Sequence, residues 1–306
     1  MVERRPGIIP PQPRPPERTR PPRAVVLRRR LVALLVVGAA VVLAWFAIAS
    51  VSGRDAKPKP KVLLPPHQFR VVFPEGFTRR QMAARVEAVA RIAAHERHVH
   101  PTLSKSTYVA DTARSLLPAR FAGDHKVRPL EGFLFPATYD FTKRTTSAQL
   151  VAAQLKAFRR NWAKLDLRYA HSKNLTPYDV LIIASMIEKE ARAPEERALV
   201  SAVIYNRLHK HMRLEIDATI RYGLNVPGTK SLRESQLHSS NPYNTRKHFG
   251  LPPTPIANPG LASMQAAAHP RHVDFLYYVA KSDKLHHFFT ASFRAFNAYK
   301  RAHGYG

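Results

Sequence analysis

The chain of 306 residues contains no cysteine, which excludes disulfide bonds and metal sites built on thiolates. It is also poor in acidic residues, with 21 Asp and Glu against 49 Lys and Arg, so its formal net charge is +28. A field of this sign attracts a polyanion, and nucleic acid, anionic lipid head groups and an acidic cell wall all qualify. The hydrophobic fraction of 45% is ordinary for a globular protein, so the chain can build a packed core.

Charge is absent altogether from residues 31–53, which read LVALLVVGAAVVLAWFAIASVSG. A helix rises about 1.5 Å per residue, so about 20 apolar residues cross the roughly 30 Å of hydrocarbon in a bilayer. Trp45 and Phe46 lie near the far end of the run, where aromatic rings suit the membrane interface. We therefore predict a transmembrane helix over residues 31–52. A buried helix of a soluble domain and a signal peptide cleaved near Ala47-Ile48-Ala49 are the alternatives.

The charges that flank this run predict its orientation. Residues 1–30 hold nine arginines, whereas residues 53–61 hold one arginine and three lysines. The flank that is richer in Lys and Arg stays in the cytoplasm. We therefore predict a single-pass protein of the cytoplasmic (inner) cell membrane, with a cytoplasmic N-terminus and an extracytoplasmic C-terminal region. Chromosomal nucleic acid is absent on that side, so we expect no nucleic-acid partner, and wall polymers and anionic lipid remain.

Composition divides the rest of the chain. Residues 1–30 are rich in Pro and Arg and predict a disordered basic tail, and residues 53–66 alternate Lys with Pro and predict an extended spacer. We expect a small N-terminal α+β subdomain over residues 67–145 and a larger domain over residues 146–306. The patterns predict an α+β fold dominated by helices. The predicted strands cover residues 69–73, 276–280 and 287–290, with a loop of strand character at 132–141, and the predicted helices cover residues 78–98, 109–117, 147–166, 177–192, 194–212 and 292–303.

The helix predicted from residue 177 has a well-marked start and end. Thr176 and Asp179 have the spacing of a capping box, and Pro177 stands in the first turn, where its missing N–H is not needed. The helix continues as VLIIASMIEKEAR and ends before Pro194, which can open the next helix.

Glu190 lies on the apolar face of this helix. Ile183, Met186 and Ile187 precede it by seven, four and three residues, so all four side chains share one face. Glu188 falls about 160° away around the helix. A carboxylate on an apolar face loses hydration, which raises its pKa and suits it to act as a general acid. The alternative is that Glu190 merely ends the apolar stripe and turns to solvent or to a basic neighbour.

A series of ordered motifs runs from Val72 to Asn297. The motifs are PEG (74–76), EGFLFP (131–136), IIASMIEKEA (182–191), ER (196–197), VIYNRL (203–208), MRLEIDATIRYG (212–223), YNT (243–245), GLPP (250–253), PIANPG (255–260), AAAHP (266–270) and FLYYVA (275–280). In this order they resemble the endolytic murein transglycosylase family.

The resemblance implies a membrane-bound lytic endotransglycosylase that cleaves nascent peptidoglycan strands. Its expected reaction breaks the bond between N-acetylmuramic acid and N-acetylglucosamine, leaves a 1,6-anhydro sugar and terminates glycan elongation. The resemblance makes residues 146–306 the catalytic domain and Glu190, the second glutamate of Glu-Lys-Glu, the catalytic residue. It implies no metal and no cofactor. The implied partners are peptidoglycan glycan strands, anionic polymers of the membrane and wall, and peptidoglycan synthases.

The resemblance also implies further features of the site and of the N-terminal region. Members of the family carry a LysM-like subdomain for wall binding before the PEG motif, and here that subdomain is truncated to part of residues 67–145. Asp217 and Thr219, which follow a probable strand, match the family's Asp-x-Thr. We expect substrate contacts from Glu188, Asp217, Thr219, Tyr243, Asn244 and Thr245. Purely structural roles in turns are the alternative for these residues, and a non-catalytic, membrane-tethered wall-binding scaffold is the alternative function.

Two histidine clusters do not have the pattern of a metal site. Residues 95–100 read HERHVH, in which the second histidine comes one position too early for the H-E-x-x-H zinc motif. His286 and His287 are adjacent at the start of a predicted strand, and adjacent strand residues point to opposite faces. We expect one of these two histidines to point inward and the other to be exposed.

Overall fold

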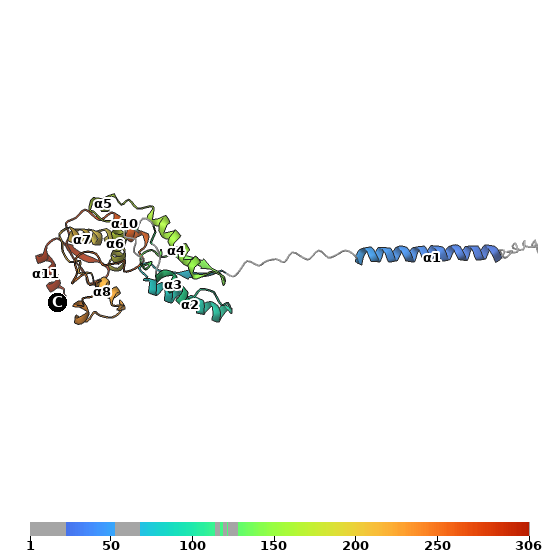
Figure 1. Cartoon of the computed structure of the whole chain (residues 1–306), viewed down its shortest axis with the longest axis horizontal. Coiled ribbons are helices and arrows are strands. Elements are labelled where there is room, and N and C mark those ends of the chain that lie inside the picture. Colours follow the sequence, from blue (N-terminus) through green and yellow to red (C-terminus); the bar gives the residue numbers. More distant parts are fainter. Residues whose placement is uncertain (1–22, 53–67, 114–116, 119–120, 122–127, 306) are drawn as a thin grey trace, which may run out of the picture. The chain divides into compact units, whose positions relative to one another are not determined.

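The computed structural model describes residues 23–52, 68–113, 117–118, 121 and 128–305. The chain divides into two compact units, Met1–Leu64 and Pro65–Gly306 (Figure 1). The predicted spacer over residues 53–66 and most of the predicted tail over residues 1–30 lie outside the described residues.

The first unit has one described element, helix α1 (Arg23–Ser52). It begins eight residues before the predicted start at residue 31, because no proline interrupts the chain between Pro22 and Pro58 and the residues that follow Pro22 are compatible with a helix. The side chains of residues 31–46 are exposed. Within the part of the chain that the structure describes, no helix is long and apolar enough to cross a membrane. The side chains of residues 47–52 lie outside the described ones, and the membrane span stays a prediction.

The second unit is mostly helical with two small sheets, as the α+β prediction requires. Its helices are α2 (Arg79–Arg97), α3 (Lys105–Ala113), α4 (Ser147–Trp162), α5 (Arg168–Ser172), α6 (Pro177–Glu190), η2 (Pro194–Glu196), α7 (Arg197–His209), α8 (Asp217–Gly223), α9 (Glu234–Leu237), α10 (Leu261–Ala268) and α11 (Phe293–Ala302). Its strands are β1 (Phe69–Val72), β2 (Thr138–Phe141), β3 (Tyr277–Ala280) and β4 (His287–Thr290).

Both sheets are antiparallel pairs. Strand β1 pairs with β2, and β3 pairs with β4 in a register that sets Tyr278 opposite Phe289 and Ala280 opposite His287. Side chains alternate between the two faces of a strand, so Tyr278, His287 and Phe289 share one face of the β3–β4 hairpin. That face is the one that reaches the candidate site.

The helix that begins at Pro177 starts as predicted. The Thr176 side chain accepts a hydrogen bond from the Asp179 backbone N–H, and the Asp179 carboxylate accepts one from the Thr176 N–H, which completes the capping box. Other boundaries differ from the predictions. Helix α3 begins four residues earlier than expected, and α10 was not predicted.

The strand predicted before Asp217 is wrong, because that segment is an irregular loop leading into helix α8. Glu215 has a positive φ of 56°, which a β-strand does not accommodate. The backbone N–H of Ile216 donates to Thr245 Oγ1 (3.0 Å) and not to a neighbouring strand. Asp217 is therefore the first residue of a short helix.

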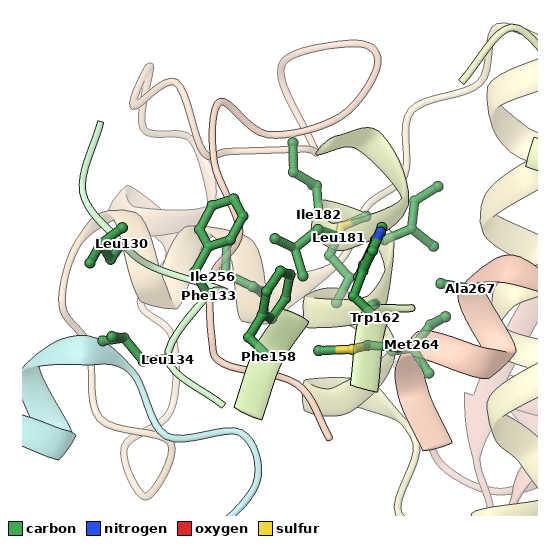
Figure 2. Packing of buried hydrophobic residues seen from close by; sticks show 14 of the residues in the cluster. Leu130, Phe133, Leu134, Phe158, Trp162, Leu181, Ile182, Ile256, Met264 and Ala267 are labelled. Atoms are coloured by element: carbon green, nitrogen blue, oxygen red, sulfur yellow. The ribbon is translucent and has the colours of Figure 1, made fainter. Parts of the chain in front are cut away.

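Helix α6 runs through the centre of the hydrophobic core. Residues 180–187 are all buried, and α7 and α10 pack against this helix. Figure 2 shows Leu181 and Ile182 of α6 among side chains from α4, α10 and the loop at 130–134. Phe133, Phe158 and Trp162 form an aromatic cluster there. The ring centroid of Phe158 lies 5.1 Å from that of Phe133 and 5.5 Å from that of Trp162. The core contains residues from both sides of position 145, and the predicted domain boundary there stays a prediction.

Asn258 joins three segments of the chain that are far apart in sequence. Its Oδ1 accepts hydrogen bonds from the backbone N–H groups of Gly132 and Leu134, both at 2.9 Å. Its Nδ2 donates to the Phe77 carbonyl (2.9 Å) and to Glu131 Oε1 (2.8 Å). Buried backbone groups need such partners, so this one amide holds the loops that close the core around α6.

Replacing Asn258 with alanine should therefore destabilise the fold. The substitution leaves two buried N–H groups without an acceptor, and each unsatisfied group costs roughly 1–3 kcal/mol. We expect the free energy of unfolding to fall by about 3 kcal/mol in chemical denaturation. The exposed Gln265→Ala in α10 is the control and should change it by less than about 0.5 kcal/mol. A loss below about 1 kcal/mol for Asn258→Ala would contradict the role given to the amide.

Candidate active site

Glu190 is the last residue of α6 and lies where three other elements meet. Its side chain is partly buried, and its Oε2 accepts a hydrogen bond from the Tyr278 hydroxyl of β3 (3.1 Å). The backbone N–H of Ala218, in the first turn of α8, also hydrogen-bonds the carboxyl group. Because α6 is buried as far as residue 187, its last turn leaves the core at Glu190, whose side chain points to Tyr278 and Ala218.

The surroundings raise the pKa of Glu190 above the ordinary glutamate value of 4.5. Burial is the main cause, because it disfavours the charged form, and the negative charge of Asp217 adds to it. The hydrogen bond from Tyr278, the electrostatic contribution of His287 and the hydrogen bond from the Ala218 N–H lower the pKa of Glu190. Burial prevails, so the site stabilises the protonated form of Glu190 more than water does, which suits a proton donor.

Asp217 lies beside Glu190 at the start of α8. It is paired with Arg246, whose Nε and Nη2 lie 2.8 and 2.7 Å from Asp217 Oδ1. The Asp217 side chain remains 45% exposed, so it is open to solvent while it acts on Glu190. Of the predicted contact residues, Asp217 is the one whose charge the structure brings to the acid.

A second carboxylate, Glu196, holds a histidine near the same site. Glu196 Oε1 accepts from the backbone N–H of His287 (2.8 Å), and its Oε2 lies 2.6 Å from His287 Nδ1. Both side chains are nearly buried, with 7% and 11% of their surface exposed. His286 points the other way, and its Nε2 contacts the exposed Glu195. The two histidines therefore face opposite sides, one inward and one exposed, as expected from strand alternation.

Glu188 lies apart from Glu190 and has a different partner. Its Oε2 accepts a hydrogen bond from the backbone N–H of Gly260 (2.9 Å), the residue that caps α10. Glu75 reaches the same place, and a Cβ at position 260 would contact its carboxylate, so any larger residue there would have to displace the Glu75 side chain. Burial raises the pKa of Glu75, Glu188 raises it further, and Arg197 lowers it. Glu188 and Glu75 thus form a separate carboxylate pair.

Three of the predicted contact residues are buried in the loops that support α8. Thr219 Oγ1 donates to the Ile216 carbonyl (2.7 Å) and lies 3.0 Å from Thr245 Oγ1. Asn244 Nδ2 donates to two carbonyls, and its Oδ1 accepts from the Arg246 N–H. Their polar atoms are already occupied, so a sugar would have to replace an internal hydrogen bond. The substrate contacts predicted for these residues stay predictions.

Tyr243 is partly buried between the site loops. Its hydroxyl lies 2.7 Å from Thr254 Oγ1, and its ring lies 5.1 Å from the ring of Tyr222 in α8. Burial raises the pKa of Tyr243. The contact with α8 makes it a support of that helix, and its predicted contact with substrate stays a prediction.

Glu131 is a fully buried carboxylate on the other side of α8. The Tyr222 hydroxyl donates to its Oε2 (3.1 Å), and the backbone N–H of Arg79 and Asn258 Nδ2 donate to its Oε1. Burial raises the pKa of Glu131 to about 7 against these hydrogen bonds. Helix α8 is therefore held by Glu131 through Tyr222, while its first turn contacts Glu190.

The residues that sequence reasoning missed are Tyr278, His287 and Glu196. Tyr278 stands in the FLYYVA motif, and alternation along a strand could have separated it from Tyr277. For His287 the sequence predicts only that it or His286 points inward, not which residue it contacts. Nothing in the sequence connects Glu196 to a histidine 91 positions later.

No cluster in the described ranges has three or more His, Cys, Asp or Glu side chains that could hold a metal ion. Two described grooves, of about 740 and about 360 Å³, are lined by other residues than Glu190. The larger runs along α2 and α3, and the smaller lies beside α7 and α10.

A family model described as the YceG-like family matches residues 56–302. The endolytic murein transglycosylase of Bacillus subtilis (strain 168) is 31% identical over 221 residues, which cover 71% of this chain and 60% of that protein. The endolytic murein transglycosylase of Streptococcus pneumoniae (strain ATCC BAA-255 / R6) is 37% identical over 187 residues, or 59% of this chain and 31% of that protein.

The fold also resembles a solved structure. The crystal structure of a YceG-like protein from Listeria monocytogenes superposes with a TM-score of 0.64 at 31% sequence identity, and the match covers 76% of each chain. The chain spans 60% of the length of the Bacillus relative and 31% of the length of the Streptococcus relative. Both curated relatives are named endolytic murein transglycosylases, and the similarity supports that family of functions for this chain.

Two substitutions should move the pKa of Glu190 in opposite directions. Tyr278→Phe removes a hydrogen bond to the charged form, so the pKa should rise further. Asp217→Asn removes a nearby negative charge, so the pKa should fall toward the ordinary value. Side-chain carbon chemical shifts of Glu190, followed by NMR over a pH titration, measure both. Movement of both variants in the same direction would contradict this account of the site.

Proposed function

Since the chain belongs to the YceG-like family, we propose that it is a lytic endotransglycosylase of peptidoglycan with Glu190 as its acid. The observation that carries the proposal is a carboxyl group whose pKa is raised by burial and whose Oε2 accepts a hydrogen bond from the Tyr278 hydroxyl. The relatives named endolytic murein transglycosylases support the same class of substrate. The expected substrate is a nascent glycan strand, and its cleavage would terminate elongation.

In the first step, protonated Glu190 donates its proton to the glycosidic oxygen between N-acetylmuramic acid and N-acetylglucosamine. The bond from that oxygen to C1 of the muramic residue breaks, and the oxygen keeps the electron pair and leaves as a hydroxyl. Proton donation by a positioned acid is typical of glycoside cleavage. The raised pKa of Glu190 favours the protonated form that this step needs.

In the second step, the muramic 6-hydroxyl supplies the nucleophile. Its oxygen forms a bond to C1, and its proton passes to the Glu190 carboxylate, which is thereby restored. The product is a 1,6-anhydro sugar, and no water is consumed. An ordinary glycosidase needs a second carboxylate to form a covalent intermediate or to activate water. Here the 6-hydroxyl of the substrate replaces that group, so the scheme needs no second catalytic carboxylate.

The positive net charge of the chain and the partly exposed Asp217 suggest how the protein binds wall polymers and the sugar. A net charge of +28 favours anionic wall polymers and anionic lipid, and peptidoglycan synthases are candidate partners at the same surface. Asp217 would contact the sugar near the acid, because its side chain is partly open to solvent. We further propose that residues 31–52 anchor the protein in the cytoplasmic membrane as a single pass.

Glu190→Gln tests the proposed acid directly. Glutamine keeps the size of the side chain but cannot donate an acidic proton, so the rate of peptidoglycan cleavage should fall by at least about 100-fold. The full chain would be incubated with purified peptidoglycan and the soluble fragments quantified by mass spectrometry. Glu96→Gln, at the exposed end of α2, is the matched control and should retain the rate.

Two results would decide against this function. An unchanged rate in Glu190→Gln would remove Glu190 from the chemistry. Binding of the wild-type chain to peptidoglycan without any cleavage would favour the non-catalytic scaffold. Binding that ignores glycan and disappears at high salt would instead indicate a basic protein that adheres to lipid.

Membrane washes test the proposed anchor. A spanning helix resists high salt and is released by detergent, whereas electrostatic adhesion is reversed by salt. Leu35→Arg combined with Val42→Arg should reduce the membrane-bound fraction, because each arginine costs roughly 2.5–3.5 kcal/mol at the centre of a spanning helix. Release of the wild-type chain by salt alone would contradict the anchor.

A further inference from the structure

Two neighbouring glutamates contact two neighbouring histidines, but only one of these pairs is built into the site. Glu195 and His286 form an exposed pair, with 66% and 37% of the side-chain surface accessible. Glu196 and His287 form the nearly buried pair. The buried Glu196 carboxylate has both oxygens occupied by a single residue, through the His287 backbone N–H and ring Nδ1.

This contact orients the His287 ring. An ionised carboxylate only accepts hydrogen bonds, so Nδ1 must carry the hydrogen that points to Glu196. The backbone contact at 2.8 Å fixes the start of β4 against η2, and the ring contact at 2.6 Å fixes the side-chain rotation. A short, buried, charge-assisted hydrogen bond of this kind is stronger than an exposed one.

The oriented His287 ring in turn contacts the residue that binds the acid. The rings of His287 and Tyr278 pack edge to face, with centroids 5.4 Å apart and planes at 90°. Phe289 packs against both rings on the same face of the hairpin, at 5.8 and 6.0 Å. Tyr278 then donates its hydroxyl hydrogen to Glu190 Oε2. A continuous path of contacts therefore runs from Glu196 to Glu190 through one ring pair.

We propose that Glu196 is a positioning residue for the acid, which acts through His287 and Tyr278 to hold the Glu190 carboxyl group in place. The inference rests on the proposed function, in which Glu190 is the proton donor. Glu196 does not touch the substrate in this scheme. Its role is to keep the β3–β4 hairpin and its two rings in register with the end of α6.

Each element that packs around Glu190 contributes a charged or titratable group. Asp217 of α8 raises the pKa of Glu190, Tyr278 of β3 and His287 of β4 lower it, and Arg246 neutralises Asp217 from the following loop. Glu196 controls two of these contributions together, because it holds His287 directly and Tyr278 through it. If Glu196 no longer holds these two residues, their lowering effect on the pKa of Glu190 weakens, and burial should raise that pKa further.

Glu196→Gln removes one of the two acceptors while it keeps the side-chain shape. In the full chain, we expect the NMR titration midpoint of Glu190 to move upward and the alkaline limb of the rate profile to move with it. We expect kcat to fall by about tenfold or more and KM to change by less than about twofold, because misplaced catalytic groups affect turnover more than binding. Glu196→Asp keeps a carboxylate and should restore part of the change. Glu195→Gln, in the exposed neighbouring pair, is the matched control and should leave both readouts unchanged.

The titration readout separates this inference from the proposed function, because it needs no substrate. An unmoved Glu190 midpoint in Glu196→Gln would overturn the positioning role, even if thermal stability fell. A moved midpoint in a chain that cleaves no peptidoglycan would support the coupling while refuting the transglycosylase proposal. An equal shift in Glu195→Gln would also overturn it, because the effect would then be one of general surface charge.

Discussion

The burial of helix α6 is the constraint on which the rest of the structure depends. Residues 180–187 have no exposed face, so neighbouring segments must cover every side of the helix, and α7, α10 and the loops tied by Asn258 do so. A helix enclosed in this way cannot turn its last residue freely to solvent. Glu190 is presented instead to the first turn of α8 and to the β3–β4 hairpin, where desolvation raises its pKa. The raised pKa of Glu190 thus follows from the packing of the segments that enclose α6.

The partners of Glu190 are held from outside the site by other buried polar groups. Glu131 holds α8 through Tyr222, and Glu196 holds the hairpin through His287. Each of these carboxylates is buried and fully hydrogen-bonded, which is the condition under which a buried polar network stabilises one arrangement and not several. The short helix and the two-stranded hairpin would be mobile if they were isolated, because neither is long enough to be stable alone. Their attachment to buried carboxylates gives the site its fixed geometry.

Much of this arrangement was predictable where the information is local. The capping box at Thr176, the helix that follows it and the position of Glu190 on its apolar face come from residues a few positions apart. The alternation of His286 and His287 is equally local. The strand expected before Asp217 was wrong, because Glu215 adopts a positive φ and Thr245 supplies the hydrogen bond that a strand partner would have supplied. The contact between Glu196 and His287 joins positions 91 residues apart, so only the tertiary fold reveals it.

The central claim is that one carboxyl group suffices because the substrate supplies its own nucleophile. Digestion of peptidoglycan by the full chain in water labelled with heavy oxygen tests this claim most directly. The account predicts new muramic ends with the mass of a 1,6-anhydro sugar and no heavy oxygen. Reducing ends that carry heavy oxygen would contradict it, because they would show that water attacks C1 and that the site works as a hydrolase.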